Sequence, residues 1–279
     1  MEQKFTTVIV PKTNLLDFHL KEVLKYRDLI FLFVKRNFVS QYKQTILGPL
    51  WAIIQPLLTT VVFTVVFGRL AGLAAAGVPA FLFFMCGNIA WQYFSGCLTQ
   101  TADTFTGNAG ILGKVYFPRI VMPISTVLTN LISFGIQFVM FLVFLAIYWV
   151  RGVVSPTLYA LLLPLLLLQM AMLSLGVGVI ISSLTTKYRD LKMLVGFGVQ
   201  LWMYGTPVAY DIGIVPQRFM GLYMLNPMTP IINTFRTAFL GLGSFDLLYY
   251  LISWGVTFAL LFVGLLLFNR VEKTFMDTV

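Results

Sequence analysis

The chain has 279 residues, of which 59% are hydrophobic and only 10% charged, and its formal net charge is +9. Soluble domains carry about 25% charged residues, so this composition excludes them and predicts an all-α integral membrane protein. The excess of Lys and Arg does not require a nucleic-acid partner, because basic residues beside membrane spans determine orientation and contact anionic lipid.

Residues 1–43 are predicted to precede the membrane domain as a cytoplasmic tail and an amphipathic interface helix. Apolar residues recur at helical spacing in this region, at Leu20, Leu24, Phe31, Val34 and Phe38. This pattern is typical of a helix lying on the membrane surface. Lys35, Arg36 and Lys43 either anchor that helix to lipid headgroups or also meet a substrate phosphate. Residues 1–28 lack the apolar stretch of a signal peptide, so no cleavage is expected.

Residues 44–279 are predicted to form a transmembrane domain of six helices. Stretches free of Asp, Glu, Lys and Arg place the spans at about 48–68, 79–102, 120–148, 156–184, 193–210 and 247–268. A helix needs about 20 apolar residues to cross a bilayer, and the fifth stretch is marginal in length. Of the 19 Lys and Arg residues, all but Arg69, Arg151, Arg218 and Arg236 then fall on one side. The positive-inside rule makes that side the cytoplasm, with both termini in it.

The third predicted span carries a polar stripe. Its members recur at the spacing of one helical face: Thr126, Asn130, Ser133 and Gln137. Side-chain amides are costly in hydrocarbon unless they are hydrogen-bonded, so the stripe faces either another helix or a polar lumen. Glycines in the fourth and fifth spans are expected to permit close helix approach, at Gly176, Gly178, Gly196 and Gly198.

The cytoplasmic loop at 103–119 is unusually apolar. A helix over 106–117, ending before Pro118, would present apolar side chains to a partner protein, from Ile111, Leu112, Val115, Tyr116 and Phe117. Residues 108–114 resemble a phosphate-binding P-loop, but Asn108 replaces its first Gly, Val115 replaces its Ser or Thr, and no strand precedes it. No nucleotide site is therefore expected in this chain.

The outer segment at 211–246 is also largely apolar. Pro216, Pro227 and Pro230 divide it into short pieces. An exposed apolar loop of this length would be a liability. Short helices that dip back into the outer leaflet fit better, since irregular backbone at membrane depth must be buried in protein or line a cavity.

The sequence lacks the residues that enzyme catalysis and ion-coupled transport require. The only His is His19, no two carboxylates are placed to act together, and Cys86 and Cys97 belong to no metal motif. The predicted spans contain no Asp, Glu, His or Arg that could carry protons or ions. The remaining functions are transport driven by a partner, a passive pore or a scaffold.

Four motifs follow one another from about Asp28 to the end of the chain. They are the elbow VKRNFVSQYKQTILGPLW, the junction KVYFPRIVMPIS, the joint KYRDLK, and the run YGTPVAYDIGIVPQRF with LNPMTPIINTFR after it. Together they resemble the permease subunit of polysaccharide ABC exporters, the group that exports O-antigen, capsule and teichoic acid.

The resemblance implies a homodimer in the cytoplasmic (inner) membrane with two ATPase subunits, which would bind ATP and Mg, so this chain needs no cofactor. The helix at 106–117 becomes a coupling helix that docks through Asn108, Ala109, Gly110, Ile111, Leu112, Lys114, Val115, Tyr116 and Phe117. Residues 215–241 become short gate helices on the outer face. The substrate would be a glycan on an isoprenoid diphosphate lipid. The alternative is an ABC permease for another lipid or a drug.

A channel that slides a glycan is expected to use aromatic rings in place of fixed charges, because sugars bind rings through their C–H faces. The channel candidates are Trp51, Gln55, Trp91, Tyr93, Phe94, Asn130, Gln137, Trp202, Tyr204 and Tyr210. The diphosphate would meet Lys35, Arg36 and Lys43, since cations bind phosphate oxygens strongly.

Overall fold

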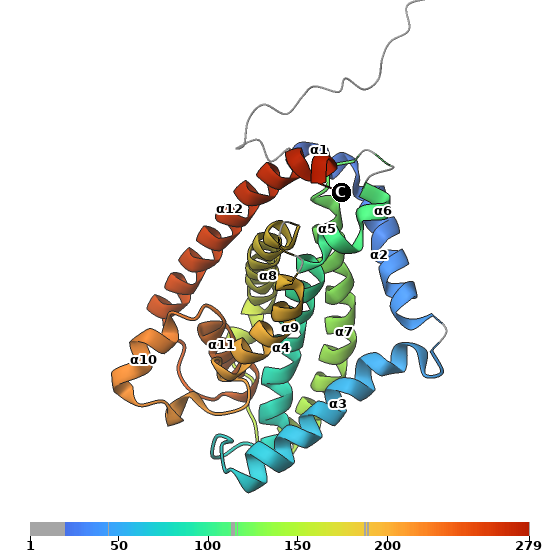
Figure 1. Cartoon of the computed structure of the whole chain (residues 1–279). Helices are drawn as coiled ribbons and strands as arrows, with labels where there is room; N and C mark the ends of the chain where they lie inside the picture. The colour runs from blue at the N-terminus through green and yellow to red at the C-terminus, as the bar shows by residue number, and fades with distance from the viewer. Residues whose placement is uncertain are drawn as a thin grey trace, which may run out of the picture.

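The computed structural model describes residues 20–43, 45–112, 115, 117–186, 188 and 190–278, without the side chains of 20–22, 109, 112 and 272–278. In that part, the regular secondary structure is all helical, joined by turns and loops, and there is no strand (Figure 1). The expected all-α class is confirmed. His19, Lys114 and Tyr116 lie outside the described residues.

The helices of the described part follow one another as α1 Leu20–Lys25, α2 Arg27–Tyr42, η1 Gly48–Leu50, α3 Trp51–Phe63, η2 Thr64–Leu70, α4 Ala80–Ala102, α5 Thr104–Gly107, α6 Ala109–Leu112, α7 Val121–Val150, η3 Leu158–Leu162, α8 Leu163–Thr185, α9 Leu191–Tyr204, η4 Ile212–Ile214, α10 Gln217–Met224, α11 Met228–Leu240 and α12 Leu247–Thr278. The turn at Gly48 has a positive φ of 52°, which only Gly adopts without strain. The chain therefore turns between the end of α2 and the helical stretch that begins at Gly48.

Helix α4 is the centre of the bundle. It packs against α3, α7, α8, α9 and α11, and most of its side chains are buried. Phe83, Phe84 and Phe94 are completely buried. A helix that is apolar nearly all round belongs in the interior, and α4 has this composition except at a few amides and hydroxyls.

Four helical stretches of the described part are long and apolar enough to cross a membrane: Gly48–Leu70, Val121–Val150, Leu158–Thr185 and Leu247–Val271. The other two expected spans correspond to α4 and α9. Helix α4 has 23 residues but includes Asn88, Gln92 and Gln100, whereas α9 has only 14 residues and falls short of the length of about 20 that a bilayer requires. Burial inside the bundle is what permits this polarity in α4.

Glycines bring α8 close to two neighbours. A Cβ at Gly176 would lie 2.7 Å from the Leu261 nitrogen of α12, and a Cβ at Gly178 would lie 2.7 Å from the Thr101 Cβ of α4. The expected close approach is confirmed at these two positions. A Cβ at Gly196 or Gly198 would meet no atom within 4 Å, so neither glycine is in close contact with another helix of the described chain.

A second apolar cluster joins α1, α2, α5 and the end of α12. Its buried members include Ile30, Phe33, Phe105, Phe117 and Phe268. Figure 1 shows these elements at one end of the molecule. Helix α2 packs on α7, while its other side exposes apolar residues, with Phe31 66% and Leu32 60% exposed. An open apolar side next to the bundle fits contact with lipid.

The expected single helix at 106–117 is replaced by two helical turns, α5 and α6. The break falls at Asn108, whose side chain donates to the Thr104 carbonyl at 3.1 Å. Gly107 and Gly110 lower the helix propensity on either side. Phe117 also differs from the expectation, since it is buried and packs on Phe33 with ring centroids 5.6 Å apart.

Candidate functional site

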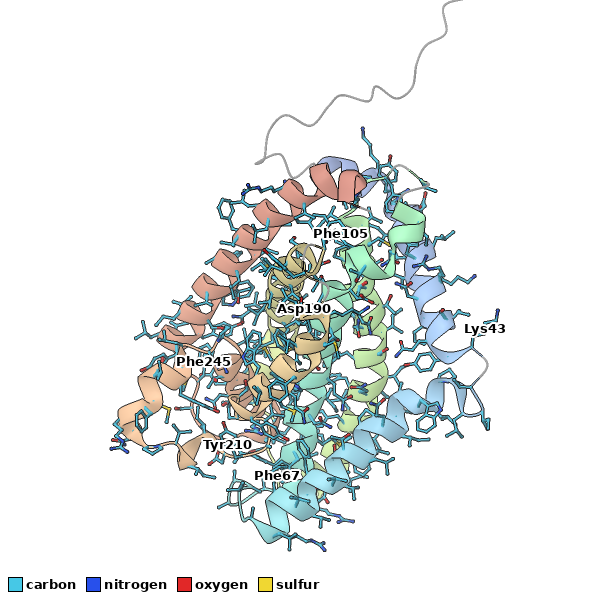
Figure 2. All side chains as sticks on the ribbon, viewed as in Figure 1. Lys43, Phe67, Phe105, Asp190, Tyr210 and Phe245 are labelled. Atoms are coloured by element: carbon cyan, nitrogen blue, oxygen red, sulfur yellow. The ribbon has the colours of Figure 1, made fainter. Side chains whose placement is uncertain are left out.

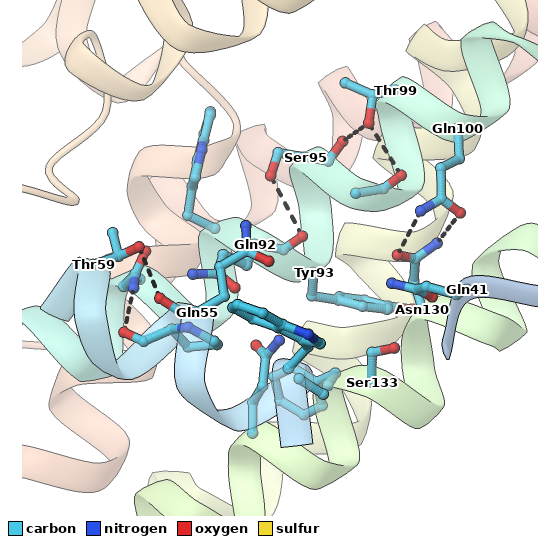
Figure 3. A pocket seen from close by; sticks show the side chains of 18 of the residues that line it. Gln41, Gln55, Thr59, Gln92, Tyr93, Ser95, Thr99, Gln100, Asn130 and Ser133 are labelled. Carbon is cyan, nitrogen blue, oxygen red and sulfur yellow. Dashed lines mark hydrogen bonds between the residues drawn. The ribbon is translucent and has the colours of Figure 1, made fainter. Parts of the chain in front are cut away.

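A cavity of about 610 Å³ lies between the end of α2 and helices α3, α4, α7 and α9 (Figure 3). Its lining comprises Gln41, Tyr42, Trp51, Ala52, Gln55, Pro56, Thr59, Asn88, Trp91, Gln92, Tyr93, Ser95, Gly96, Thr99, Gln100, Asn130, Ser133, Phe134, Gln137, Gly196, Val199 and Met203. Seven of these residues carry an amide side chain. The lining is therefore rich in hydrogen-bonding groups.

Helix α4 supplies one wall of the cavity because its polar residues share a face. Asn88, Gln92, Ser95 and Thr99 recur at three- and four-residue intervals. Asn88 donates to the Pro56 carbonyl and to the Thr60 hydroxyl, both at 3.4 Å. These bonds connect the wall to α3.

The polar stripe of α7 supplies the opposite wall. It both contacts another helix and faces a polar cavity, the two alternatives that the sequence left open. The Asn130 and Gln100 amides pair between α7 and α4, with one bond of 3.0 Å and one of 3.5 Å. Gly96 leaves room for this pair, because a Cβ there would lie 2.7 Å from the Asn130 oxygen. Farther along the stripe, Ser133 and Gln137 line the cavity. One end of the stripe therefore connects two helices, and the other faces an open space.

The structure brings six of the predicted channel residues together at this cavity: Trp51, Gln55, Trp91, Tyr93, Asn130 and Gln137. Trp51 and Gln55 are exposed, whereas Trp91 and Tyr93 are each 4% exposed. The tyrosine ring packs on Phe134 with centroids 5.4 Å apart. Trp91 and Tyr93 are therefore mainly packed between helices, and only a small part of each ring is exposed to the cavity.

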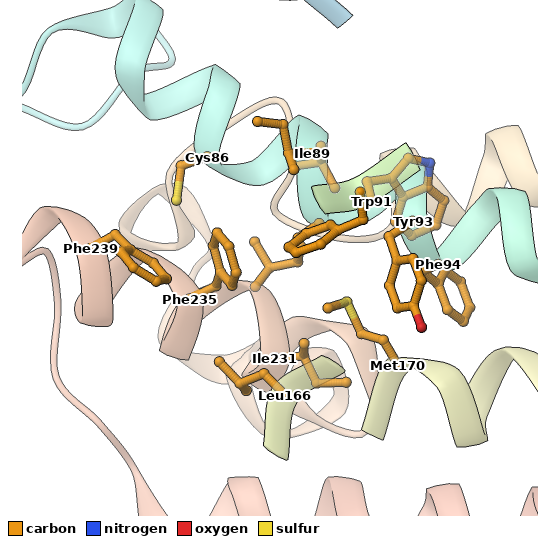
Figure 4. Packing of buried hydrophobic residues seen from close by; sticks show 14 of the residues in the cluster. Cys86, Ile89, Trp91, Tyr93, Phe94, Leu166, Met170, Ile231, Phe235 and Phe239 are labelled. Carbon is orange, nitrogen blue, oxygen red and sulfur yellow. The ribbon is translucent and has the colours of Figure 1, made fainter. Parts of the chain in front are cut away.

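Four predicted channel residues lie elsewhere. Phe94 is fully buried in the core (Figure 4). Its ring meets Trp202 edge-on, with centroids 5.1 Å apart. Tyr204 is 48% exposed at the end of α9, and its carbonyl accepts the Tyr210 hydroxyl at 2.9 Å. Tyr210 also contacts the Tyr223 hydroxyl of α10. An aromatic side chain is therefore not sufficient to predict a position in the cavity, because packing of the neighbouring helices determines which face of each helix is open.

Two polar residues of the outer segment have structural roles that the sequence did not reveal. Arg236 is 3% exposed, donates to the Val208 carbonyl at 2.8 Å and the Tyr210 carbonyl at 3.1 Å, and lies 3.7 Å above the Phe83 ring centroid. Asn226 bonds the Trp202 ring nitrogen at 2.9 Å. The only available signal was the motif LNPMTPIINTFR, which contains both residues.

The cationic residues predicted for a diphosphate are exposed and spread along α2. Arg36 stacks on Phe33 at 4.7 Å and bonds Asn37, whereas Lys43 directly follows the cavity residue Tyr42. Lys43 lies in the connection between α2 and α3 (Figure 2). Of the three, it is the one adjacent in sequence to the cavity lining.

The loop predicted to dock an ATPase keeps part of its surface open. Gly110 and Val115 are exposed, Asn108 is half-buried, and Ile111 packs on the second apolar cluster. Asp103 at its start forms an ion pair of 2.7 Å with Lys192 of α9. The loop is therefore joined to a helix that lines the cavity.

Comparison with known proteins agrees with this architecture. An O-antigen export system permease protein of Klebsiella pneumoniae is 28% identical over 90% of this chain and 94% of its own length. One from Myxococcus xanthus is 29% identical over 78% and 83%, and the polysialic acid transport protein KpsM of Escherichia coli is 21% identical over 87% and 93%. Residues 28–240 match the family described as ABC-2 type transporter. The chain belongs to that family of multi-pass membrane permeases.

Proposed function

We propose that this chain is the membrane-spanning subunit of an ATP-driven exporter that moves a lipid-linked polysaccharide across the inner membrane. The observation that carries the proposal is the amide- and aromatic-lined cavity of about 610 Å³ in an ABC-2 permease. The permeases similar to this chain are named for O-antigen and polysialic acid, both polysaccharides. The substrate would be an O-antigen-like glycan on an isoprenoid diphosphate.

In this proposal, α4 and α9 complete a six-span domain at 44–279, both termini lie in the cytoplasm, and residues 1–43 form the tail and interface helix. Two copies of the chain associate, and helices α10 and α11 act as gate helices. The exposed faces of α3 and α9 support a second copy, since α9 has no buried residue within one chain. A face that is apolar and open in the monomer is suited to an interface.

The glycan path runs through the cavity, and the diphosphate is met by Lys43, with Lys35 and Arg36 farther along α2. Trp51 is the ring best placed to contact sugar, because it lines the cavity and is 43% exposed. Two ATPase subunits bind ATP and Mg and dock at residues 108–117. The open surface around Gly110 supports that docking position.

The test is export of surface glycan in a strain that lacks its own permease and receives this chain with its ATPase. Trp51→Ala is expected to lower the export rate at least fivefold without reducing the amount of permease in the membrane. Trp149→Ala is the matched control, since Trp149 is 60% exposed and lies outside the cavity. Equal export by both variants would exclude Trp51 from the glycan path.

A further inference from the structure

The cavity is polar but carries no fixed charge. Among the residues that line it in the described part of the chain, none is Asp, Glu, Lys, Arg or His. Its polarity comes from amides and hydroxyls. A binding site of this kind offers hydrogen bonds without a counter-charge.

Several of the cavity amides have unused hydrogen-bonding capacity. Within the described residues, the side chains of Gln55, Gln92 and Gln137 line the cavity and make no side-chain hydrogen bond, in contrast to the paired amides of Gln100 and Asn130. Each free amide supplies two donors and one acceptor. Sugar hydroxyls also donate and accept, so an amide can serve either end of such a bond. Of these three, Gln137 is buried, and a buried amide without a partner is costly unless water or a hydroxylated ligand fills the space beside it.

The cations close in sequence to the lining are themselves outside it. Lys192, four residues before Gly196, pairs with Asp103 at 2.7 Å. Lys43 is exposed at the end of α2, and Arg36 lies six residues before Tyr42, about 9 Å along the helix axis. These cations suit a single diphosphate at the mouth. A polymer with a carboxylate on each sugar would instead bring repeated charges into a space that has no partner for them, at a large desolvation cost.

We propose that the cavity selects uncharged glycans and discriminates against acidic ones. This inference rests on the proposed function and specifies its substrate class: a polysaccharide of neutral sugars, free of carboxylate groups. The selectivity follows from the hydrogen bonds that the lining provides and from the cations that it lacks.

The test uses two probes of equal length that differ at one carbon: galactose oligosaccharide, with CH2OH at C6, and galacturonic acid oligosaccharide, with a carboxylate there. Binding to the purified complex of permease and ATPase is followed at pH 7 by tryptophan fluorescence, since Trp51 and Trp91 line the cavity. The neutral probe is expected to bind at least tenfold more tightly at low salt. Trp51→Phe, which removes one reporter, assigns the signal to the cavity.

Two variants at one position separate charge from shape. Gln55→Lys is expected to raise the affinity for the acidic probe at least tenfold, and Gln55→Glu is expected to weaken it further. Equal affinity of the unchanged complex for both probes, or an equal response of the two variants, would overturn the inference while leaving glycan export in place. Binding of neither probe would overturn the cavity as a glycan site, and the export assay would then decide the proposed function separately.

Discussion

Asn226 joins the end of α9 to the start of α11 through both ends of its amide. Its oxygen accepts from the Trp202 ring nitrogen at 2.9 Å and from the Met228 backbone at 3.1 Å. Its nitrogen donates to the Gly205 carbonyl and the Thr206 hydroxyl, each at 2.9 Å. One side chain thus hydrogen-bonds a backbone N–H at the start of α11, a backbone carbonyl at the end of α9 and the Trp202 indole. No other residue type provides two donors and an acceptor of this size.

Asn226→Ala is expected to destabilise the protein by about 3 kcal/mol, because four hydrogen bonds of about 1 kcal/mol each are lost and partly replaced by water. The measurement is thermal unfolding of the permease in detergent. Asn233→Ala is the matched control, since its amide makes one long bond of 3.4 Å to the Ser244 carbonyl. Equal melting shifts for the two variants would contradict the role assigned to Asn226.

At the scale of elements, the contact between α8 and α12 depends on the absence of two side chains. A Cβ at Gly264 would lie 2.5 Å from the Gly176 carbonyl oxygen, closer than side-chain carbons approach backbone oxygen. Gly255 of the same helix has no atom within 4 Å of such a Cβ. Helix α12 therefore contains one glycine that the packing requires, Gly264, and one that the packing does not require, Gly255.

Gly264→Ala is expected to lower the melting temperature by several degrees, because α12 must move away from α8 and overpacking costs about 1–3 kcal/mol. Gly255→Ala is expected to be neutral or stabilising by up to about 1 kcal/mol, since Ala is the better helix former. Thermal unfolding of both variants in detergent checks this pair. Equal destabilisation by both would mean that the helices are not packed at Gly264 as described.

The docking proposal for residues 108–117 also belongs to this scale. Gly110→Asp is expected to abolish export and co-purification of the ATPase, because a negative charge would be placed next to Ile111, an apolar residue of the predicted docking surface. Gly110→Ala is the control, since nothing lies within 4 Å of a Cβ there and the methyl group should be tolerated. Membrane insertion of both variants is measured in parallel. Normal export by Gly110→Asp would exclude docking at this position.

For the whole molecule, the sequence predicted the helical class and the division of 211–246 into short helices, because charge spacing and Pro act locally. It could not decide which aromatic residues face the cavity. Trp91 and Phe94 lie three residues apart on α4, yet only the first lines the cavity, since α9 covers the second through Trp202. Which aromatic residues line the cavity depends on how the neighbouring helices pack, and the local sequence does not show this. For the same reason, Arg236 was recognised only as an outside charge.

Coupling between the loop at 103–112 and the cavity is expected to pass through one ion pair. Asp103 at the start of the loop meets Lys192 at 2.7 Å, and α9 continues from Lys192 to the cavity residues Gly196, Val199 and Met203. Both side chains are partly exposed, 39% and 57%, so the pair contributes at most about 1 kcal/mol to stability. Its expected effect is therefore on transmission of movement rather than on folding.

Lys192→Asp is expected to lower glycan export severalfold while leaving ATPase binding and the melting temperature nearly unchanged. Combining it with Asp103→Lys restores opposite charges across the same contact and keeps the net charge, so export should recover in part. Recovery is expected to be incomplete, because Asp103 also accepts a hydrogen bond from Thr106. Wild-type export by Lys192→Asp, or a double variant no better than the single one, would show that the loop and the cavity communicate by another route.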